Sequence, residues 1–264
     1  MTTTLPSSFD SREALIQHVK DLAPWAIGEA SHILGGREKA EEQLQNIDPV
    51  SYVRSRNYGN GAVTRLSPYI RCGILSLNEV RNHALTKCSQ SAQITKFIQE
   101  LAWRDFWQRI YKQHPEWIWS DIEAYKTGFT TNDYANELPG DIENGTTGIA
   151  CLDYFISELI STGYLHNHAR MYLASYIVHF RRIKWQMGAR WFLSHLLDSD
   201  PASNNLSWQW VASTFSNKPY IFNLENVDKY FGQLTDTSSS SNELLDASYE
   251  ELTARLFPNK RGFK

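Results

Sequence analysis

One stretch near the middle of the chain combines an acid, an arginine and two tryptophans at helical spacing. Glu100, Trp103, Arg104 and Trp107 stand at positions i, i+3, i+4 and i+7, so a helix would carry all four on one face. This composition is unusual for a face that only meets solvent, which makes it a candidate binding or catalytic surface. Tryptophan packing beside a surface Glu–Arg ion pair is the plainer explanation, and spacing alone leaves both open.

A second helical set repeats this spacing further along the chain. Asn167, Arg170 and Met171 stand at i, i+3 and i+4. His166 and His168 flank the asparagine, but side chains two positions apart do not share a helix face. We therefore expect no metal site, and we expect the two imidazoles to be surface or hydrogen-bonding groups.

The segment from Asp198 to Trp210 gathers carboxylates, amides and indoles. Asn204 and Trp208 would share a face of a helix that begins at Pro201. A paired-carboxylate hydrolase and a calcium loop are two functional explanations, although the ligand alternation of a calcium loop is missing. A helix start capped by an aspartate is the plain alternative.

A short polar segment, residues 63–68, follows the glycine-containing turn 58–61. Its hydroxyls and Arg65 suit a phosphate group, because a guanidinium can donate two parallel hydrogen bonds to phosphate oxygens. Loops of this composition are common, so the segment alone is a weak signal.

The elements that would position these residues are helical. Leu152, Phe155, Ile156, Leu159 and Ile160 follow the spacing of one helix face. Ser76 and Glu79 form a capping-box pattern at the start of a helix that is expected to end near Leu85. Alternating strand patterns and a glycine-rich dinucleotide fingerprint are absent from the sequence, so we predict an all-α fold.

Composition narrows the class of protein. Of the 264 residues 42% are hydrophobic, which is enough for a sizeable core, and the formal net charge of −3 requires any nucleic-acid site to be a local basic patch. Three widely spaced cysteines form no metal or disulfide pattern. With no signal peptide and no run of about 18 apolar residues, a cytoplasmic protein without a membrane contact is expected.

The chain is expected to have three regions. Residues 1–34 form a leader with an amphipathic helix at Ser11–Leu22, and residues 35–232 form the aromatic, motif-bearing domain. Residues 233–264 comprise a serine-rich linker, flexible around 235–241, and a last helix from about Leu244 to Phe257.

Taken in chain order, the polar stretches resemble the FAD-binding domain of the DNA photolyase/cryptochrome family. The most specific of them are Thr64–Tyr69, Glu100–Phe106, Gly163–Met171 and Asp198–Trp210. The resemblance runs from Gly35 to about Phe231 and implies an all-α photolyase/cryptochrome-type domain that holds a U-shaped FAD. The family's N-terminal α/β antenna domain has no counterpart in the sequence given, so no antenna chromophore is expected in this chain.

The resemblance also implies roles for individual residues. Thr64, Arg65, Leu66 and Ser67 match the diphosphate loop, and Tyr52 loosely matches a tyrosine that covers the phosphates. Arg104 matches a further cofactor contact, and Arg170 is expected to pair with Asp198. The implied neighbours of the flavin are Asn167, Arg170, Asp198, Asp200 and Asn204, with Asn204 facing N5.

A lesion pocket is implied as well. Its residues would be Glu100, Trp103, Asn167, Met171 and Trp210. The indoles would stack on flipped bases, and Glu100 would lie at the carbonyl edge of a pyrimidine dimer. Glu100 would also be a neighbour of the cofactor. The expected activity is light-driven repair of dimers in DNA by reduced FAD, with weak or single-strand binding. A cryptochrome-like light sensor with an unknown protein partner and a flavoenzyme for another substrate are the alternatives.

Several positions depart from the family pattern. The family usually has a polar residue where this chain has Val63. It usually has a tryptophan at Tyr164 and often an arginine at His168. Trp208 and Trp185 match the first two members of the electron relay, but no tryptophan matches the outer one. We expect a tyrosine or a route through Trp191 to take the place of the outer tryptophan. The aromatic residues that the segment 125–135 offers are Tyr125, Phe129 and Tyr134. A DNA-facing basic patch would consist of Arg181, Arg182, Lys184, Arg190 and Lys218.

Overall fold

The computed structural model describes residues 6–25, 28–88 and 90–259. The chain divides into two compact units, Met1–Leu34 and Gly35–Lys264. Among the described residues the regular elements are helices, and one isolated parallel bridge joins Ala135 to Ile183. The all-α prediction is therefore confirmed for the described part of the chain.

The first unit contains helix α1, Arg12–Leu22, which Ser11 caps by accepting a hydrogen bond from the amide of Ala14. None of its residues is buried, and the apolar side chains of Leu15, Val19 and Leu22 are exposed. The amphipathic helix expected here is present.

The N-terminal part of the second unit has its own small core. Buried side chains of Leu44, Leu66, Val80, Ile94 and Phe97 meet there. The elements that supply this core are α2 (Arg37–Gln45), α3 (Pro49–Ser55), α4 (Ser67–Arg71), α5 (Leu77–Thr86), a 3-10 turn (Ser91–Ile94) and the start of α6 (Thr95–Gln113). Ser76 and Glu79 form the predicted capping box of α5, which ends one residue beyond the predicted Leu85.

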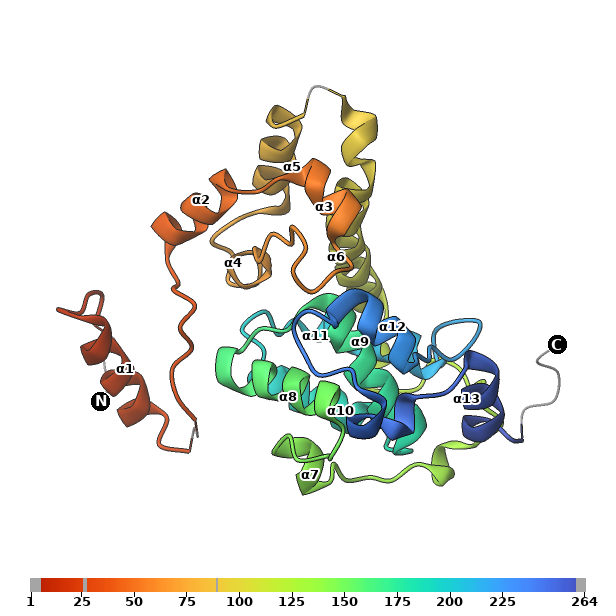
Figure 1. Ribbon diagram of the computed structural model, residues 1–264. Coiled ribbons are helices and arrows are strands. Elements are labelled where there is room, and N and C mark those ends of the chain that lie inside the picture. The colour runs from red at the N-terminus through yellow and green to blue at the C-terminus, as the bar shows by residue number, and fades with distance from the viewer. Residues whose placement is uncertain (1–5, 26–27, 89, 260–264) are drawn as a thin grey trace. The chain divides into compact units, whose positions relative to one another are not determined.

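Helix α6 connects this core to the rest of the unit (Figure 1). It packs against α3 and α5 near its start and against α11 (Pro201–Ala212) further along. The predicted face with Glu100 and Arg104 therefore runs between the two halves of the unit.

The larger core lies among the remaining helices. It contains Phe155, Tyr172, Trp185, Phe192 and Phe222, each almost fully buried. Its helices are α7 (Gly140–Glu143), α8 (Ala150–Thr162), α9 (Asn167–Ser175), α10 (Trp185–His195), α11, α12 (Leu224–Phe231) and α13 (Tyr249–Leu256). Short 3-10 turns lie at Pro115–Ile118, Thr131–Asp133, Ser239–Ser241 and Glu243–Leu245.

Helix α8 confirms most of its predicted buried face. Leu152, Phe155, Ile156 and Leu159 are fully buried, but Ile160 is 42% exposed. Ile160 lies eight residues after Leu152, about 80° further around the helix at 100° per residue, which takes it beyond the buried stripe. Gly163 ends the helix at φ 69°, a left-handed conformation that favours glycine.

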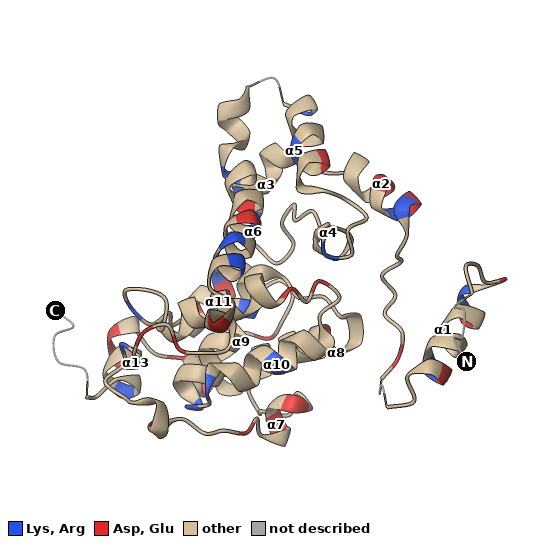
Figure 2. Cartoon of the chain, turned by 180° about the vertical axis from the view of Figure 1, so that it is seen from behind, with Lys and Arg blue, Asp and Glu red and all other residues tan. Residues whose placement is uncertain are grey.

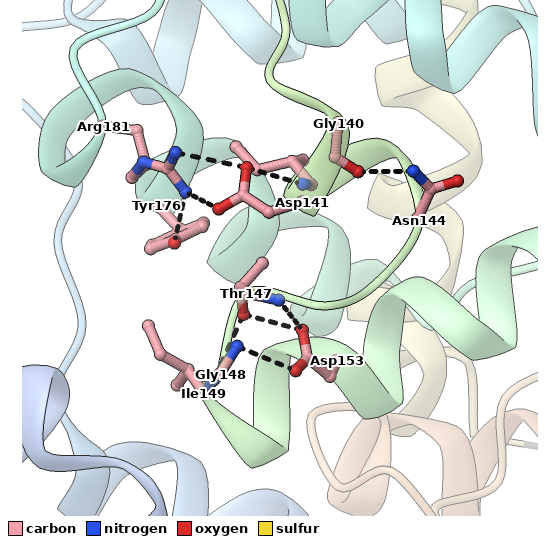
Figure 3. A network of polar contacts seen from close by, with 10 residues as sticks. Gly140, Asp141, Asn144, Thr147, Gly148, Ile149, Asp153, Tyr176 and Arg181 are labelled. Atoms are coloured by element: carbon pink, nitrogen blue, oxygen red, sulfur yellow. Dashed lines mark hydrogen bonds and ion pairs between the residues drawn. The ribbon is translucent and has the colours of Figure 1, made fainter.

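A polar network fixes the start of α8 and the turn before it (Figure 3). The Asp153 carboxylate accepts hydrogen bonds from the amides of Thr147 and Gly148 and from the Thr147 hydroxyl. The Arg181 guanidinium pairs with Asp141 at 2.7 Å and donates to the Tyr176 hydroxyl at 3.0 Å. These contacts tie the segment around α7 to the end of the helix that follows α8.

That end is a π-helical turn, Tyr176–Phe180, which continues α9. Within it the buried His179 ring lies 2.8 Å from the carbonyl oxygen of Val211. Just before the turn, the Ser175 hydroxyl donates to the Tyr220 carbonyl oxygen. The wide turn and the residue before it therefore hold the two ends of the loop that follows α11.

Residues 233–259 belong to the second unit and pack against its larger core. The side chain of Asn242 is buried, accepts a hydrogen bond from the Cys151 amide, and donates to the carbonyl oxygens of Asp236 and Ser238. Leu245 belongs to the larger core. The serine-rich segment is thus hydrogen-bonded to the domain, whereas its composition indicates a flexible linker. No described helix has both the length and the apolar character that crossing a membrane would require.

Candidate functional site

A buried ion pair joins α9 to the segment before α11. The Arg170 guanidinium donates to both carboxylate oxygens of Asp198, at 3.0 and 2.9 Å, and to the Leu165 carbonyl oxygen at 2.8 Å. Burial would raise the pKa of the Asp198 carboxyl, but the Arg170 charge outweighs this effect and holds that pKa below its ordinary value. Arg170 and Asp198 thus form the expected pair, and both remain charged in the fold.

Asp200 joins α6 to α11. As the N-cap of α11 it accepts a hydrogen bond from the Ser203 amide, and its two oxygens accept from the Gln108 side chain at 2.7 Å. The Arg104 guanidinium lies 3.8 Å from the same carboxylate. The plain explanation of this segment, a helix capped by aspartate, is confirmed, and the cap also lies within reach of an arginine.

Gln108 is a site residue that the sequence interpretation missed. It stands four positions after Arg104, on the face that begins with Glu100. Extending that face by one helical turn would have identified it.

Arg65 and Arg170 lie over the same aromatic ring. Their guanidinium carbons are 5.5 and 5.7 Å from the ring centroid of Tyr164. Arg65 has a φ of 52°, in the left-handed region that costs a non-glycine residue about 1–3 kcal/mol. Tyr164, noted above as a departure from the family pattern, therefore contacts both cations.

The rest of the predicted phosphate loop is divided between this site and the core. Ser67 hydrogen-bonds the Asp198 carboxylate and begins α4. The Thr64 carbonyl oxygen accepts from Gln43, and its hydroxyl lies 3.4 Å from the Leu66 amide. The Leu66 side chain is buried in the small core, so only its backbone could contact a ligand.

Asn204 lies one turn after Asp200, at the α10–α11 contact. Its side-chain amide donates to the Ala189 carbonyl oxygen at 3.1 Å and to the Asn205 side chain at 2.9 Å. The amide is thus anchored to α10 in a fixed orientation.

The predicted acid-and-indole face of α6 is half exposed. Glu100 is paired with Lys96 at 2.8 Å and lies 3.5 Å from Arg56. Trp103 is 47% exposed and stacks on Trp107, with ring centroids 5.4 Å apart. The tryptophan packing of the plainer explanation is present, but Glu100 pairs with Lys96 and Arg56 while Arg104 faces Asp200, and one indole remains open to solvent.

The other predicted pocket residues come from helices that flank this face. Asn167 is exposed, and its side-chain amide lies 3.9 Å from the Met171 sulfur. Trp210 is 42% exposed near the end of α11. Both α6 and α9 pack against α11, so the three helices that carry the predicted pocket are neighbours.

Tyr52 lies on the Glu100 side of the site. Its ring meets Phe97 edge-on, with centroids 5.1 Å apart. Burial and then the Glu100 charge raise the pKa of the Tyr52 hydroxyl, which therefore stays protonated at neutral pH.

The two relay candidates are buried in adjacent helices. Trp185 donates its indole N–H to Asp121 at 2.7 Å, and the Trp208 ring lies against Gly188 of α10. Near Asp121, Tyr125 and Tyr134 form a stack with centroids 4.3 Å apart. Phe129 lies under the Arg182 guanidinium at 3.6 Å.

The predicted basic patch is only partly available for a ligand. Arg181 is paired with Asp141, Arg182 lies on Phe129, and Arg190 lies on Trp119. Figure 2 shows basic and acidic residues interspersed along the helices of the second unit, including α6. Lys218 is exposed, and no ion pair involves it in the described part of the chain.

The charges of the site suit an FAD. A diphosphate needs cations, and Arg65 offers an exposed guanidinium that no described acid pairs with, while Arg104 is 3.8 Å from its nearest carboxylate. The buried Ser203 hydroxyl has no hydrogen-bond partner among the described residues. Buried Asp198 and Asp200 provide acceptors that Arg170 and Gln108 hold in place, as the N–H groups of a flavin edge require.

Two hollows on the surface of this unit lie away from the Arg170–Asp198 pair and from Asp200. One, of about 580 Å³, lies between α5 and α6, and the other, of about 610 Å³, lies beside Trp210. Neither is lined by the two carboxylates or the three arginines described above. Among the described residues, no three His, Cys, Asp or Glu side chains are grouped closely enough to hold a metal ion.

Comparison with known proteins identifies relatives of this chain. The family model for the FAD binding domain of DNA photolyase matches residues 97–238. A deoxyribodipyrimidine photo-lyase of Alkalihalophilus pseudofirmus is 32% identical over 206 residues, which cover 75% of this chain and 43% of the relative. The chain thus spans less than half the length of that relative.

Two solved structures are similar in fold. An archaeal photolyase from Sulfolobus tokodaii with two FAD molecules is 26% identical with a TM-score of 0.65, over 90% of this chain and 54% of that one. A cryptochrome from Synechocystis has a TM-score of 0.67 at 21% identity, over 89% and 49%.

Proposed function

Because the chain belongs to the photolyase/cryptochrome family and carries the family's FAD-binding domain, we propose that it repairs cyclobutane pyrimidine dimers in DNA. Bound FAD supplies the light-driven electron that splits the dimer. The residues of this chain bind both molecules and hold them in place.

One observation carries the proposal: the α6 face exposes an indole beside a carboxylate, and two basic side chains hold that carboxylate in position. Trp103 is 47% exposed, and Glu100 is held by Lys96 and Arg56. An extruded base gains about 1–3 kcal/mol by stacking on an aromatic side chain. Trp210 on α11, which packs on α6, and Asn167 and Met171 on α9, which packs on α11, complete the pocket.

Each cofactor residue has a stated task. Arg65, Thr64, Ser67 and the Leu66 backbone bind the diphosphate, and Tyr52 covers it. Arg104 and Asp200 bind the cofactor between α6 and α11. The Arg170–Asp198 pair, Asn167 and Asn204 would surround the flavin, and the hydrogen bond of Asn204 to α10 would fix the side chain that we expect to face N5.

The Glu100 carboxyl acts at the substrate. As a carboxylate it accepts a hydrogen bond from an N–H group of the dimer, and when it carries a proton it donates one to a dimer carbonyl oxygen, while Lys96 and Arg56 hold it in place. Trp103 and Trp210 stack on the extruded bases. Trp185 and Trp208, buried behind the site, relay electrons that restore the reduced cofactor.

We further propose weak binding with a preference for single-stranded DNA. The net charge of −3 and the engagement of Arg181 with Asp141 leave few cations for the backbone of a duplex. Single-stranded DNA presents the dimer without the cost of unpairing it.

The test compares Trp103→Ala with Trp119→Ala, since Trp119 is also partly exposed but lies under Arg190. Bound FAD is measured from the visible spectrum, and dimer repair is measured in illuminated oligonucleotides. Trp103→Ala should keep FAD and bind the dimer roughly 5- to 100-fold more weakly, whereas Trp119→Ala should match the wild type.

Three outcomes count against the proposal. Equal repair by both variants would remove Trp103 from the substrate site. A yellow, light-responsive protein that repairs no dimer would favour the cryptochrome-like sensor, whose protein partner would then be sought. A colourless protein that takes up no added FAD would contradict the cofactor site as well.

A further inference from the structure

A groove opens beside Trp210, at the end of helix α11. It encloses about 610 Å³, within the range of small-molecule binding sites. The loop after α11, residues 213–221, forms one wall, and α13 forms the other.

The walls of this groove are aromatic. Trp210 is 42% exposed and lies 5.7 Å from Tyr220, with the two rings tilted by 39°. Tyr249, at the start of α13, is 46% exposed on the opposite wall. Large rings left open to solvent around a hollow suit a flat partner.

The loop that forms the groove is held in one conformation. The Ser216 hydroxyl contacts the carbonyl oxygens of Trp210 and Lys218 at 2.8 and 2.9 Å, and the Tyr220 amide donates to the Val211 carbonyl oxygen at 3.1 Å. On the other wall, Phe257 packs edge-on against the buried His179 ring. A ligand would therefore bind without having to order these walls first.

The polar groups of the groove favour a phosphate-linked partner. Lys218 and Asn217 are exposed at its rim, and no aspartate or glutamate is among the described residues that line it. A cation beside aromatic rings is the combination that binds single-stranded nucleic acid, where rings stack on bases and the cation meets the backbone.

We propose that this groove binds the nucleobase next to the dimer on single-stranded DNA. The inference rests on the proposed function, because Trp210 is shared between the dimer pocket and the groove. The base stacks between Trp210 and Tyr249, and Lys218 contacts the adjoining phosphate. Helix α13 thereby becomes part of the substrate site.

The experiment measures binding of fluorescein-labelled single strands by anisotropy, in the dark, with the FAD-loaded protein. Each strand carries one thymine dimer, and the base on its 5′ or 3′ side is intact or replaced by an abasic site. One of the two abasic strands should bind the wild type roughly 5- to 100-fold more weakly than the intact strand.

Variants link this loss to the groove. Tyr249→Ala should weaken binding of the intact strand by about as much as the abasic site weakens binding of the wild type. On the abasic strand that the wild type binds weakly, this variant should cause no further loss of affinity. Tyr249→Phe keeps the ring and should bind like the wild type. Lys218→Ala should weaken binding to every strand and lower the salt dependence by about one counterion.

The outcomes distinguish the two proposals. If the protein binds the dimer, but neither abasic site and neither Tyr249 variant changes the affinity, the groove is not a nucleobase site. The repair proposal then stands, and a peptide is the next partner to test. If no strand with a dimer is bound better than one without, the proposed function fails first. Thermal unfolding of each variant verifies that α13 remains folded.

Discussion

At the scale of single residues, the fold buries two imidazoles near the proposed site. His166 Nε2 and His179 Nδ1 have no hydrogen-bond partner among the described residues. Burial lowers the pKa of each ring to about 4. Both rings are therefore neutral in the folded protein at neutral pH.

These histidines predict how stability depends on pH. When the chain unfolds, each ring regains an ordinary pKa of about 6.5, so the unfolded state binds more protons between pH 6.5 and pH 4. The free energy of unfolding should fall across that window as the pH decreases, by up to about 3 kcal/mol for each ring. Urea denaturation at several pH values measures this.

His179→Gln isolates one of the two contributions. Glutamine can still donate to the Val211 carbonyl oxygen but cannot take up a proton. The slope of unfolding free energy against pH should become shallower in this variant. An unchanged slope would mean that the His179 ring is not kept neutral by burial.

At the scale of elements, the contact between α10 and α11 depends on a missing side chain. A Cβ on Gly188 would lie 2.2 Å from one carbon of the Trp208 ring and 2.5 Å from the next. The indole is rigid and almost fully buried, so it cannot move aside. The glycine lets the two helices approach with the ring between them.

Gly188→Ala should therefore destabilise the protein although alanine favours helices. Overpacking costs about 1–3 kcal/mol, which outweighs the gain of about 1 kcal/mol in helix propensity when the clash is severe. Gly140→Ala is the matched control, because its Cβ would lie 3.7 Å from the Asn144 side chain, in ordinary van der Waals contact. Chemical denaturation should give a lower midpoint for the first variant only.

The sequence predicts the local parts of this architecture well. Caps at Ser11, Ser76 and Asp200 mark helix starts because a capping side chain bonds to amides two or three residues away. The buried face of α8 follows from spacing alone. Contacts that span long separations, such as Arg181 with Asp141, have no local pattern to reveal them.

In the candidate site, too, local features can be predicted from the sequence, whereas long-range contacts cannot. The pairing of Arg170 with Asp198 was predictable only through the family resemblance, since 28 residues separate them. The position of Gln108 on the α6 face could be read from the spacing, but its bond to Asp200, 92 residues away, has no local pattern that would reveal it. The roles of these residues toward FAD and DNA stay predictions.

At the scale of the whole molecule, the last described residues belong to the second unit. Composition indicates a flexible linker at 235–241, but Asn242 bonds to Cys151, 91 positions earlier, and Leu245 is buried. Low complexity describes only local sequence, whereas a buried amide and a buried leucine anchor this segment through long-range contacts.

Asn242→Ala should lower the free energy of unfolding by about 1–3 kcal/mol, because it leaves the buried Cys151 amide without its acceptor. Ser240→Ala, on the same segment but exposed, should change it by less than about 0.5 kcal/mol. Thermal and urea unfolding compare the two. Equal stability of both variants would indicate that the segment detaches readily.

The π-helical turn Tyr176–Phe180 has a consequence for how this chain tolerates insertions and deletions. Removing one residue there would rotate everything before it by about 100° relative to everything after it. Ser175 and His179, which hold the two ends of the 213–221 loop, could then no longer both reach their carbonyl oxygens. Single-codon deletions should be accepted far more readily in surface turns than at this one.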